Sequence, residues 1–397
     1  MANSLTAFNP EIWRGEMQET FFKESTALGV CSVDLRAELS VGDTLHQPYG
    51  SYARVQTYSK GTDITVKDVN ATDDYITVST AKVASFYVDD LDKVQNKYDA
   101  VSNFAKGAMS QLNNVIDQAV LNAGVTYAAS TISGASIGET AGNLVYTEAN
   151  MAKVFTAATR ILDTKKRTGG ERFAMISPRM KETIVNAVSG RETGFGENVS
   201  DNGVIAKRFG FRLVLSNNLP FTATLDGATI FADTETITIN GVTFTADADG
   251  AAVGAGHFSI QGSAALCIAQ LASAINDDGT PGVDTYIALS DEDRQLIEEA
   301  GIVATIVGTD LVLTGYGDIV VSEACAGSGW SAQKQTALFG IDGSVALITQ
   351  VAPMVYFRDA QLRLGKYVHP WMLYGVGVFE RMKNNLVKVE MDASSWA

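Results

Sequence analysis

The sequence predicts a mixed α+β protein organised around one long helix. Between Asp90 and Asn122, apolar and small side chains recur at steps of three and four residues, which is the spacing of one helix face. The preceding segment, 49–88, changes to an alternation of apolar and polar residues that is typical of strands. The acidic excess of the chain also falls in a single block, 221–345. We therefore expect a long helix, extended β-segments and a separately charged domain.

The N-terminal segment predicts a short amphipathic helix. Asn9 is a suitable cap, Pro10 suits the first helical position, and Gly29 ends the pattern. Large apolar side chains recur between them at near-helical spacing: Trp13, Met17, Phe21 and Leu28. Such a face usually packs into a core, but no other core element accompanies it here. The core that it fills could equally belong to a neighbouring chain.

Residues 49–88 predict long, polar, extended strands or a hairpin. Ile64 and Val66, and later Ile76 and Val78, alternate with polar residues. A lone hairpin with so little apolar surface is marginally stable in water. We therefore expect another subunit to support it.

The helix predicted over 90–122 is much longer than an average helix. At about 1.5 Å per residue it would span roughly 50 Å. No proline interrupts it, and Gly124 is the expected C-terminal stop. Apolar residues cover a wider face in its second half, so that half is expected to be the more buried one.

A compact α/β segment should follow the long helix. Thr147 is a suitable cap for a helix. A short buried strand at 172–176 runs into Pro178, which begins a further helix, and 209–215 predicts another strand.

Residues 221–345 contain 17 acidic residues and two basic ones, Arg294 and Lys334, whereas the rest of the chain has 28 of each. This asymmetry predicts a well-solvated domain on an otherwise neutral body. Within the block the pattern predicts a strand pair at 237–245, two helices and further strands, a small α+β or β-rich domain. Because the charge is balanced again after Val345, we interpret the block as an insertion whose two ends lie close together.

The sequence carries no motif of a common enzyme class, so no catalytic residue, cofactor site or metal site is predicted. It has no phosphate-binding glycine loop, no GxSxG and no HExxH. The three cysteines have no CxxC spacing. The three histidines are scattered: His46, His257 and His369. The only basic cluster ends a predicted helix, where it complements the helix dipole, and does not form a nucleic-acid-binding stripe: Lys165, Lys166 and Arg167.

The composition indicates a soluble globular chain. Its 397 residues, 46% of them hydrophobic, are enough for two or three domains. The opening residues lack a basic region followed by an apolar one, and the longest uncharged runs are broken by Gly, Ser, Gln or Pro. Neither a signal peptide nor a membrane span is predicted.

The order of these elements resembles the major capsid (coat) protein of tailed bacteriophages, which has the Hong Kong 97-like fold, and within that group the podovirus coat class with an inserted domain. The resemblance covers most of residues 1–220 and 346–397. It rests on these segments: MANSLTAFNPEIWRGEM at the N-terminus, AMISPRMKETI at 174–184, FGFRLVLSNNLP at 209–220, APMVYFRDAQLRL near the end, and LYGVGVFERMKNNLVKVEMD at 373–392. None of them is a catalytic motif, so the order and spacing of the elements carry the resemblance.

The resemblance implies a division of the chain into the parts of a capsid subunit. They are an N-terminal arm at 1–45, an extended loop at 46–88, a spine helix at 89–124, a peripheral and axial domain in two parts at 125–220 and 346–397, and the inserted acidic domain at 221–345. Inserted domains of this class are often β-barrels, whereas two helices are predicted here. We expect the insertion to project outward, because 17 carboxylates would be unfavourable beside enclosed DNA.

The implied function is structural, with no enzyme activity and no cofactor. Hexamers and pentamers of the chain would form an icosahedral shell, assembled in the host cytoplasm and present in the virion. Scaffolding and portal proteins would be partners, and packaged DNA would be enclosed without sequence-specific binding. Candidate subunit contacts are apolar anchors in the arm and charged residues at the loop tip: Trp13, Phe21, Phe22, Lys60, Asp63 and Lys67. Truncation before Gly29 is expected to stop assembly and leave the body folded.

Two alternatives remain at this point. A virion tail, decoration or adhesive protein would explain the Gly-, Thr- and Ala-rich segments of 221–345, but it gives no reason for the long helix. An enzyme with an unrecognised site would need a cleft with converging carboxylates, and the sequence indicates none.

Overall fold

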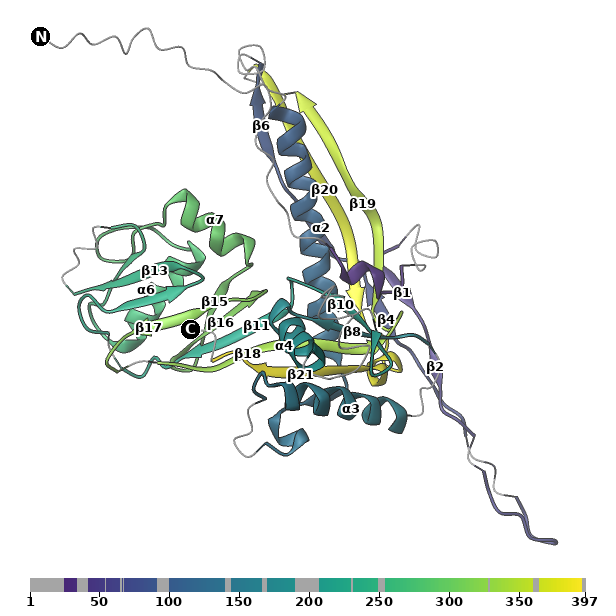
Figure 1. The fold of residues 1–397 in the computed structure, drawn as a ribbon. Helices are drawn as coiled ribbons and strands as arrows, with labels where there is room; N and C mark the ends of the chain where they lie inside the picture. The colour runs from purple at the N-terminus through teal and green to yellow at the C-terminus, as the bar shows by residue number, and fades with distance from the viewer. Residues whose placement is uncertain are drawn as a thin grey trace, which may run out of the picture.

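The structure is a computed structural model of the 397-residue chain. It describes residues 25–33, 42–53, 55–64, 66, 68–90, 100–139, 144–165, 170–189, 207–229, 231–248, 254–327, 329–359 and 364–394. Figure 1 shows a long helix with strands beside it, a layer of strands and helices at its lower end, a lobe to one side, and a thin loop that projects away from the body. The mixed α+β class predicted from the sequence is confirmed.

The long helix, α2, runs over Ala100–Tyr127. Residues 91–99, where the prediction places its first turns, lie outside the described part of the chain. Burial follows the predicted gradient, because Phe104 is 54% exposed whereas four side chains of the second half are buried: Leu112, Ile116, Val120 and Leu121.

The prediction that Gly124 stops this helix was wrong. The helix continues for three residues beyond it, to Tyr127. A Cβ atom at Gly124 would collide with the side chain of Leu338. The glycine therefore lets the helix approach the strand that carries Leu338.

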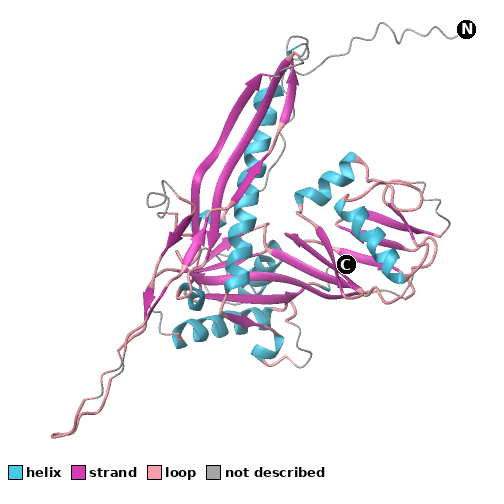
Figure 2. Cartoon of the chain, turned by 180° about the vertical axis from the view of Figure 1, so that it is seen from behind, coloured by secondary structure: helices cyan, strands magenta, loops and turns pink. Residues whose placement is uncertain are grey.

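A four-stranded sheet lies along the helix (Figures 1 and 2). Its longest strands form an antiparallel pair, and two short strands from before the helix extend it. Its members are β19 (Ala346–Asp359), β20 (Gly365–Gly377), β5 (Thr80–Val83) and β6 (Phe86–Asp89). Phe86 on this sheet contacts Phe104 of the helix at 6.1 Å between ring centroids. The helix-facing side of the sheet is thus the buried side.

A nine-stranded sheet forms the layer at the lower end of α2. Its main path runs β15-β16-β11-β18-β8-β10-β9, and β21 pairs with β18 and β7. The strands are β7 (Ser130–Ile132), β8 (Arg172–Ile176), β9 (Lys207–Arg208), β10 (Phe211–Leu215), β11 (Pro220–Leu225), β15 (Val303–Val307), β16 (Asp310–Tyr316), β18 (Trp330–Ile341) and β21 (Leu386–Asp392). Short 3₁₀ turns lie at Ala27–Gly29 (η2), Gly134–Ile137 (η4) and Met382–Asn385 (η5).

Two amphipathic helices, α3 (Glu148–Thr164) and α4 (Pro178–Ser189), accompany this sheet and confirm the predicted pattern. The strand predicted at 209–215 begins two residues later, because Phe209 and Gly210 form a positive-φ turn between β9 and β10. Three aromatic rings from the helix and the sheet meet in the first hydrophobic core: Phe155, Phe211 and Phe339.

The side lobe contains a second hydrophobic core and a four-stranded sheet of order β14-β13-β12-β17. Its elements are β12 (Thr236–Ile239), β13 (Val242–Asp247), β14 (His257–Ser259), β17 (Val321–Ala324), α6 (Ala264–Asn276) and α7 (Asp291–Glu299). The predicted strand pair is confirmed, with Asn240 and Gly241 at positive φ in its two-residue turn. Both predicted helices are present, and Ser290 caps the acidic one.

One sheet runs through both hydrophobic cores. In β18, Lys334 is paired with Thr222 of the acidic block, whereas Leu338 is paired with Met175 of the body. The chain thus enters the acidic block along β11 and comes back to the body along the neighbouring strand β18. This return lies before Val345, where the charge composition changes. A domain boundary at 221 and 345 stays a prediction.

The segment predicted as an extended loop begins and ends in short antiparallel pairs. β1 (Thr44–His46) pairs with β4 (Tyr75–Thr77), and β2 (Tyr49–Gly50) pairs with β3 (Ala71–Thr72). Between these pairs, the described residues of 51–70 contain no strand, so the predicted strands are absent from the projecting part. The last part of the predicted segment forms β5 and β6 of the long sheet. In the described part of the chain, no helix is long and apolar enough to span a membrane.

Candidate assembly surfaces

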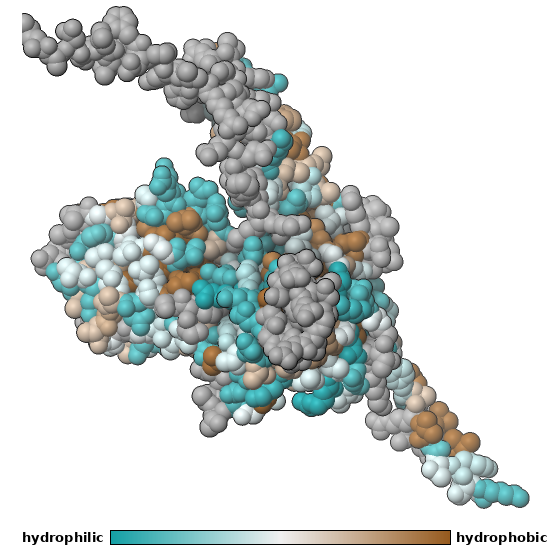
Figure 3. Space-filling view, viewed as in Figure 1, coloured by the Kyte–Doolittle hydropathy of each residue, from teal (hydrophilic) through white to brown (hydrophobic). Residues whose placement is uncertain are grey.

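The projecting loop, residues 51–70, exposes a set of large apolar side chains. Their exposed fractions lie between 57% and 100%: Tyr52, Val55, Tyr58, Ile64, Val66 and Val69. Hydrophobic atoms are visible on this loop at the lower right of Figure 3. Single exposed apolar residues are normal on a protein surface, whereas a group of them marks an interaction surface.

The predicted charged contacts lie on the same loop. Lys60 and Asp63 are exposed, Lys60 within and Asp63 directly after a tight turn in which the backbone N–H of Thr62 donates to the carbonyl oxygen of Ser59 at 3.1 Å. Lys67 lies outside the described residues, as do the arm residues Trp13, Phe21 and Phe22. Their roles as subunit contacts stay predictions.

The sequence prediction missed the apolar residues of the loop as candidates. Ile64 and Val66 alternate with polar residues, which predicts extended strands or a hairpin supported by another subunit, and the charged residues of the tip are predicted as its contacts. The structure leaves both side chains exposed, at 68% and 87%. The available signal was their chemistry, since β-branched and aromatic residues in a segment without a core of its own need a partner.

The base of the loop, unlike its tip, is packed into the body. Ile76 and Val78 are buried in a small hydrophobic cluster with Ile348 and Phe379. At Gly375 of β20, a Cβ atom would lie only 2.5 Å from the carbonyl oxygen of Thr77, so a glycine is needed where the strand passes the loop base. The base is therefore fixed, while the tip is presented to solvent.

The outer face of the long sheet is a second aromatic surface. From position 367 to position 374 of β20, the even-numbered residues are buried. The odd-numbered residues between them are half-exposed: Tyr367, His369, Trp371 and Leu373. Tyr87 packs on Tyr367 at 5.3 Å between centroids, and Tyr356, opposite His369, is 56% exposed. The half-exposed aromatic side chains of β20, β19 and β6 thus gather on one face of the sheet.

The root of the N-terminal arm is tied to the spine helix through Asp117, which is fully buried. One carboxylate oxygen accepts hydrogen bonds from the backbone N–H of Ala27 at 2.6 Å and the hydroxyl of Ser25 at 3.0 Å. The other accepts from the side-chain amide of Asn218 at 3.0 Å, and that amide also donates to Asn114. A single carboxylate thus joins the arm, the spine helix and the segment just before the acidic block.

The three histidines do not lie together in the structure. Each histidine has a different partner, in a different sheet: His46 with Asp73 at 2.8 Å, His257 with Asp247 at 2.7 Å, and His369 with Ser85 at 2.8 Å. No group of three or more His, Cys, Asp or Glu side chains among these residues could hold a metal ion. Burial raises the pKa of Cys31 to about 11, so its thiol is protonated at neutral pH.

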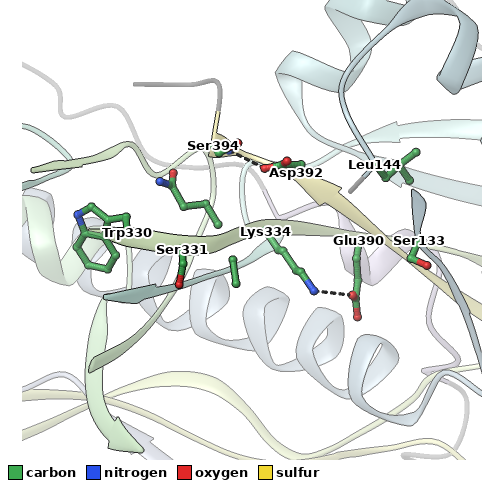
Figure 4. A pocket seen from close by; sticks show the side chains of 10 residues that line it. Ser133, Leu144, Trp330, Ser331, Lys334, Glu390, Asp392 and Ser394 are labelled. Carbon is green, nitrogen blue, oxygen red and sulfur yellow. Dashed lines mark hydrogen bonds and ion pairs between the residues drawn. The ribbon is translucent and has the colours of Figure 1, made fainter. Parts of the chain in front are cut away.

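A pocket lies between β18 and β21 (Figure 4), with Trp330 at one end and Ser133 and Leu144 at the other. Inside it, the ammonium of Lys334 lies 3.3 Å from the carboxylate of Glu390, which also pairs with Lys388 at 3.0 Å. Burial opposes the ionisation of Glu390, but the two lysines together lower its pKa below the ordinary value. The charged groups are paired with one another, as in a structural ion-pair network.

The arrangement of spine helix, long sheet, lower sheet and projecting loop is that of phage capsid subunits. The chain is similar to a structure from Mycobacterium phage Che8, with a TM-score of 0.60 and 12% identity over 97% of this chain and 98% of that one. It is also similar to the capsid structure of cyanophage P-SCSP1u, with a TM-score of 0.57 and 14% identity over 98% and 95% of the two chains. A third match is the capsid asymmetric unit of cyanophage Pam1, with a TM-score of 0.54 and 10% identity over 99% and 98%.

The sequence itself identifies the family. The profile described as Gp10A-like, major capsid protein, matches residues 52–286, more than half of the chain. No curated protein sequence matches the chain. The chain belongs to the Gp10A-like major capsid protein family, and its function is that of a structural shell protein of a tailed phage. The sequence-based recognition is confirmed, and the tail, decoration or adhesive alternative is not supported.

Proposed function

We propose that this chain assembles into an icosahedral shell of hexamers and pentamers in which the projecting loop of each subunit packs on a neighbouring subunit. The family is one of multimeric capsid shells, which places the protein in the virion. The exposed apolar side chains of residues 51–70 carry the proposal. Burying one such side chain contributes roughly 1.5–3 kcal/mol, and a shell repeats the contact many times.

Charged contacts at the loop tip would add specificity. Lys60 and Asp63 lie within the apolar set and are free to approach a neighbouring surface. Exposed ion pairs contribute about 0–1 kcal/mol each, so they would select the register of the contact and contribute little to its strength. We propose Lys67 as a further charged contact. The arm residues Trp13, Phe21 and Phe22 are proposed as further apolar contacts.

A triple variant tests the role of the loop directly. Val55→Thr, Ile64→Thr and Val66→Thr together keep the loop's length and β-branched shape but remove apolar surface. We expect unassembled chains with unchanged unfolding behaviour and no shells in sedimentation. The matched control is Val307→Thr, at a residue of the side lobe with 62% exposure, which should assemble normally. Normal shells from the triple variant would contradict the proposal.

The domain organisation supports a shell subunit with an inserted acidic domain in the Hong Kong 97-like manner. Support comes from the second hydrophobic core, which gathers side chains from Phe221 to Val321, and from the four-stranded sheet that belongs to this lobe. We propose that the lobe points outward, because the block 221–345, to which it belongs, has 17 acidic residues and only two basic ones, Arg294 and Lys334. Such charge is favourable in solvent and unfavourable against DNA phosphates.

Scaffolding and portal proteins and packaged DNA are the partners that we propose by analogy with the family, with assembly in the host cytoplasm. The DNA would be enclosed without sequence-specific binding, which fits a net charge of -15. A gel-shift assay with the unassembled chain checks this, because tight binding to one duplex sequence would contradict it. The role is proposed to be free of enzyme activity and cofactors.

A further inference from the structure

We propose that Arg381 is a positioning residue that fixes the direction in which the projecting loop leaves the body. Its guanidinium donates a hydrogen bond to the carbonyl oxygen of Gly50 and another, at 3.3 Å, to the hydroxyl of Tyr52. The same group lies over two aromatic rings, 5.2 Å from the centroid of Tyr49 and 5.1 Å from that of Tyr52. One side chain therefore contacts three residues of the outgoing limb of the loop.

The residues beside Arg381 hold the other limb and the end of the spine helix. The backbone N–H of Glu380 donates to the carboxylate of Asp74, on the returning limb, at 2.6 Å. The ammonium of Lys383 pairs with the Glu380 carboxylate and lies 5.2 Å from the ring centroid of Tyr127, the last residue of α2. One turn of the chain thus joins both limbs of the loop to the spine helix.

Strand pairing by itself is too limited to set the direction of the loop. The pair nearest the tip, β2 with β3, contains two residues on each side. Short two-stranded segments are marginally stable in water, so the pair can bend or twist unless something else holds it. Contacts on both limbs at once restrict that movement.

The chemistry of arginine suits this role. A planar guanidinium can stack on aromatic rings and donate hydrogen bonds in its own plane at the same time, so it fixes an angle as well as a distance. A lysine ammonium is a compact charge without a preferred plane. We therefore expect Arg381→Lys to retain only part of the effect.

The consequence for the protein rests on the function proposed above. A loop that already points toward its docking surface loses less conformational freedom when it binds, so more of the contact energy is available for association. Arg381 would thus promote assembly without touching the neighbouring subunit.

The direction of the loop can be measured in the unassembled chain. Spin labels would be placed at Ser59→Cys on the loop tip and Ala149→Cys on α3, in a Cys31→Ser, Cys325→Ser background; Cys267 is buried. Pulsed electron paramagnetic resonance then gives the distance distribution between the labels. We expect a narrow distribution with Arg381, a broad one with Arg381→Ala and an intermediate one with Arg381→Lys. Arg160→Ala, at an exposed arginine of α3, is the matched control and should leave it narrow.

Assembly gives the second readout. Arg381→Ala removes two charge-assisted hydrogen bonds and two ring contacts within the subunit. Because these contacts affect assembly only through the loop's freedom of movement, we expect shell yield to fall by about tenfold and not by the full energy of the contacts. If this variant does not fold, the distance distributions of Arg381→Lys and Tyr52→Leu decide the question. An unchanged distribution in the folded variants overturns the proposal even if shells form. A natural chain that forms no shells would instead contradict the proposed function, and the distance measurement would still test Arg381.

Discussion

Asp117 of the spine helix accepts a hydrogen bond from the backbone N–H of Ala27, a residue 90 positions earlier in the chain, at 2.6 Å. Both residues are fully buried. The bond places the root of the arm against the middle of the spine helix, and Asn218 completes the contact from the segment just before the acidic block. Three parts of the subunit therefore depend on one carboxylate.

Replacement of this carboxylate should destabilise the chain. Asp117→Ala leaves the backbone N–H of Ala27 without its acceptor and removes one of the two acceptors of the Asn218 amide, which should cost about 2–3 kcal/mol. Urea unfolding followed by tryptophan fluorescence measures the loss. The control Asp359→Ala, at a carboxylate that is 86% exposed, should change stability by less than about 0.5 kcal/mol. Equal effects of the two variants would contradict this account of Asp117.

The contact between Ala27 and Asp117 shows where a truncation of the arm should end. Ala27 and Val30 are part of the first hydrophobic core, so removal of residues up to 28 deletes body contacts as well as the arm. A truncation of residues 1–24 spares these contacts. We expect it to prevent shell formation while the urea unfolding midpoint stays close to that of the full chain. Normal shells from this truncation would show that the arm is dispensable.

Acid should weaken the pairing of Glu390 in the pocket between β18 and β21. Its folded-state pKa is lowered, so the stability that it contributes is present above the ordinary value of 4.5 and is lost as the pH falls through the lowered value. Glu390→Gln should therefore be less stable than the natural chain at pH 7, and the difference should shrink below about pH 4.5. Urea titrations at a series of pH values measure this difference in the free energy of unfolding. A difference that grows toward low pH would contradict a lowered pKa for Glu390.

Gly375 of β20 lies so close to the backbone of the loop base that a larger residue should destabilise the chain. In Gly375→Ala, the new methyl group would lie 2.5 Å from the carbonyl oxygen of Thr77 and 2.9 Å from the Cα of Val78, so β20 and the loop base must separate. We expect a loss of roughly 1–3 kcal/mol in a urea titration. Gly29→Ala, where no atom lies within 4 Å of the added Cβ, is the control and should be nearly neutral.

The orientation of the acidic lobe can be read by chemical labelling. Glu292→Cys on α7, in the Cys31→Ser, Cys325→Ser background, should react with a large polymer maleimide as fast in assembled shells as in unassembled chains. A lobe that faces the interior would protect the thiol in shells. Protection would reject the outward orientation.

Periodicity was sufficient to predict most individual elements. The long helix, the helix that begins at Pro178 and the strand pair around Asn240 depend on neighbouring residues only, and the structure contains each of them. Gly124 was misassigned because a glycine that ends a helix and a glycine that admits a neighbour look alike in sequence. The neighbour, Leu338, is brought there by the tertiary fold.

The long-range relationships were beyond the sequence pattern. The pairing of Thr222 with Lys334 joins the two cores in one sheet, and no local signal specifies it. Asp117 looks like an ordinary polar residue of a helix until Asn218 and Ala27 are placed beside it. The exposed residues of the loop follow the alternation of a strand, but the described residues of 51–70 form no strand, because alternation alone does not supply a pairing partner within the chain.

The central claim is that this chain builds closed shells. Sedimentation velocity with negative-stain imaging of the purified full chain, alone and co-expressed with the products of neighbouring genes, tests it most directly. We predict closed particles of uniform diameter built from many subunits. A chain that sediments as a monomer or trimer under all of these conditions would contradict the account, and it would leave the exposed apolar residues of the projecting loop without a partner.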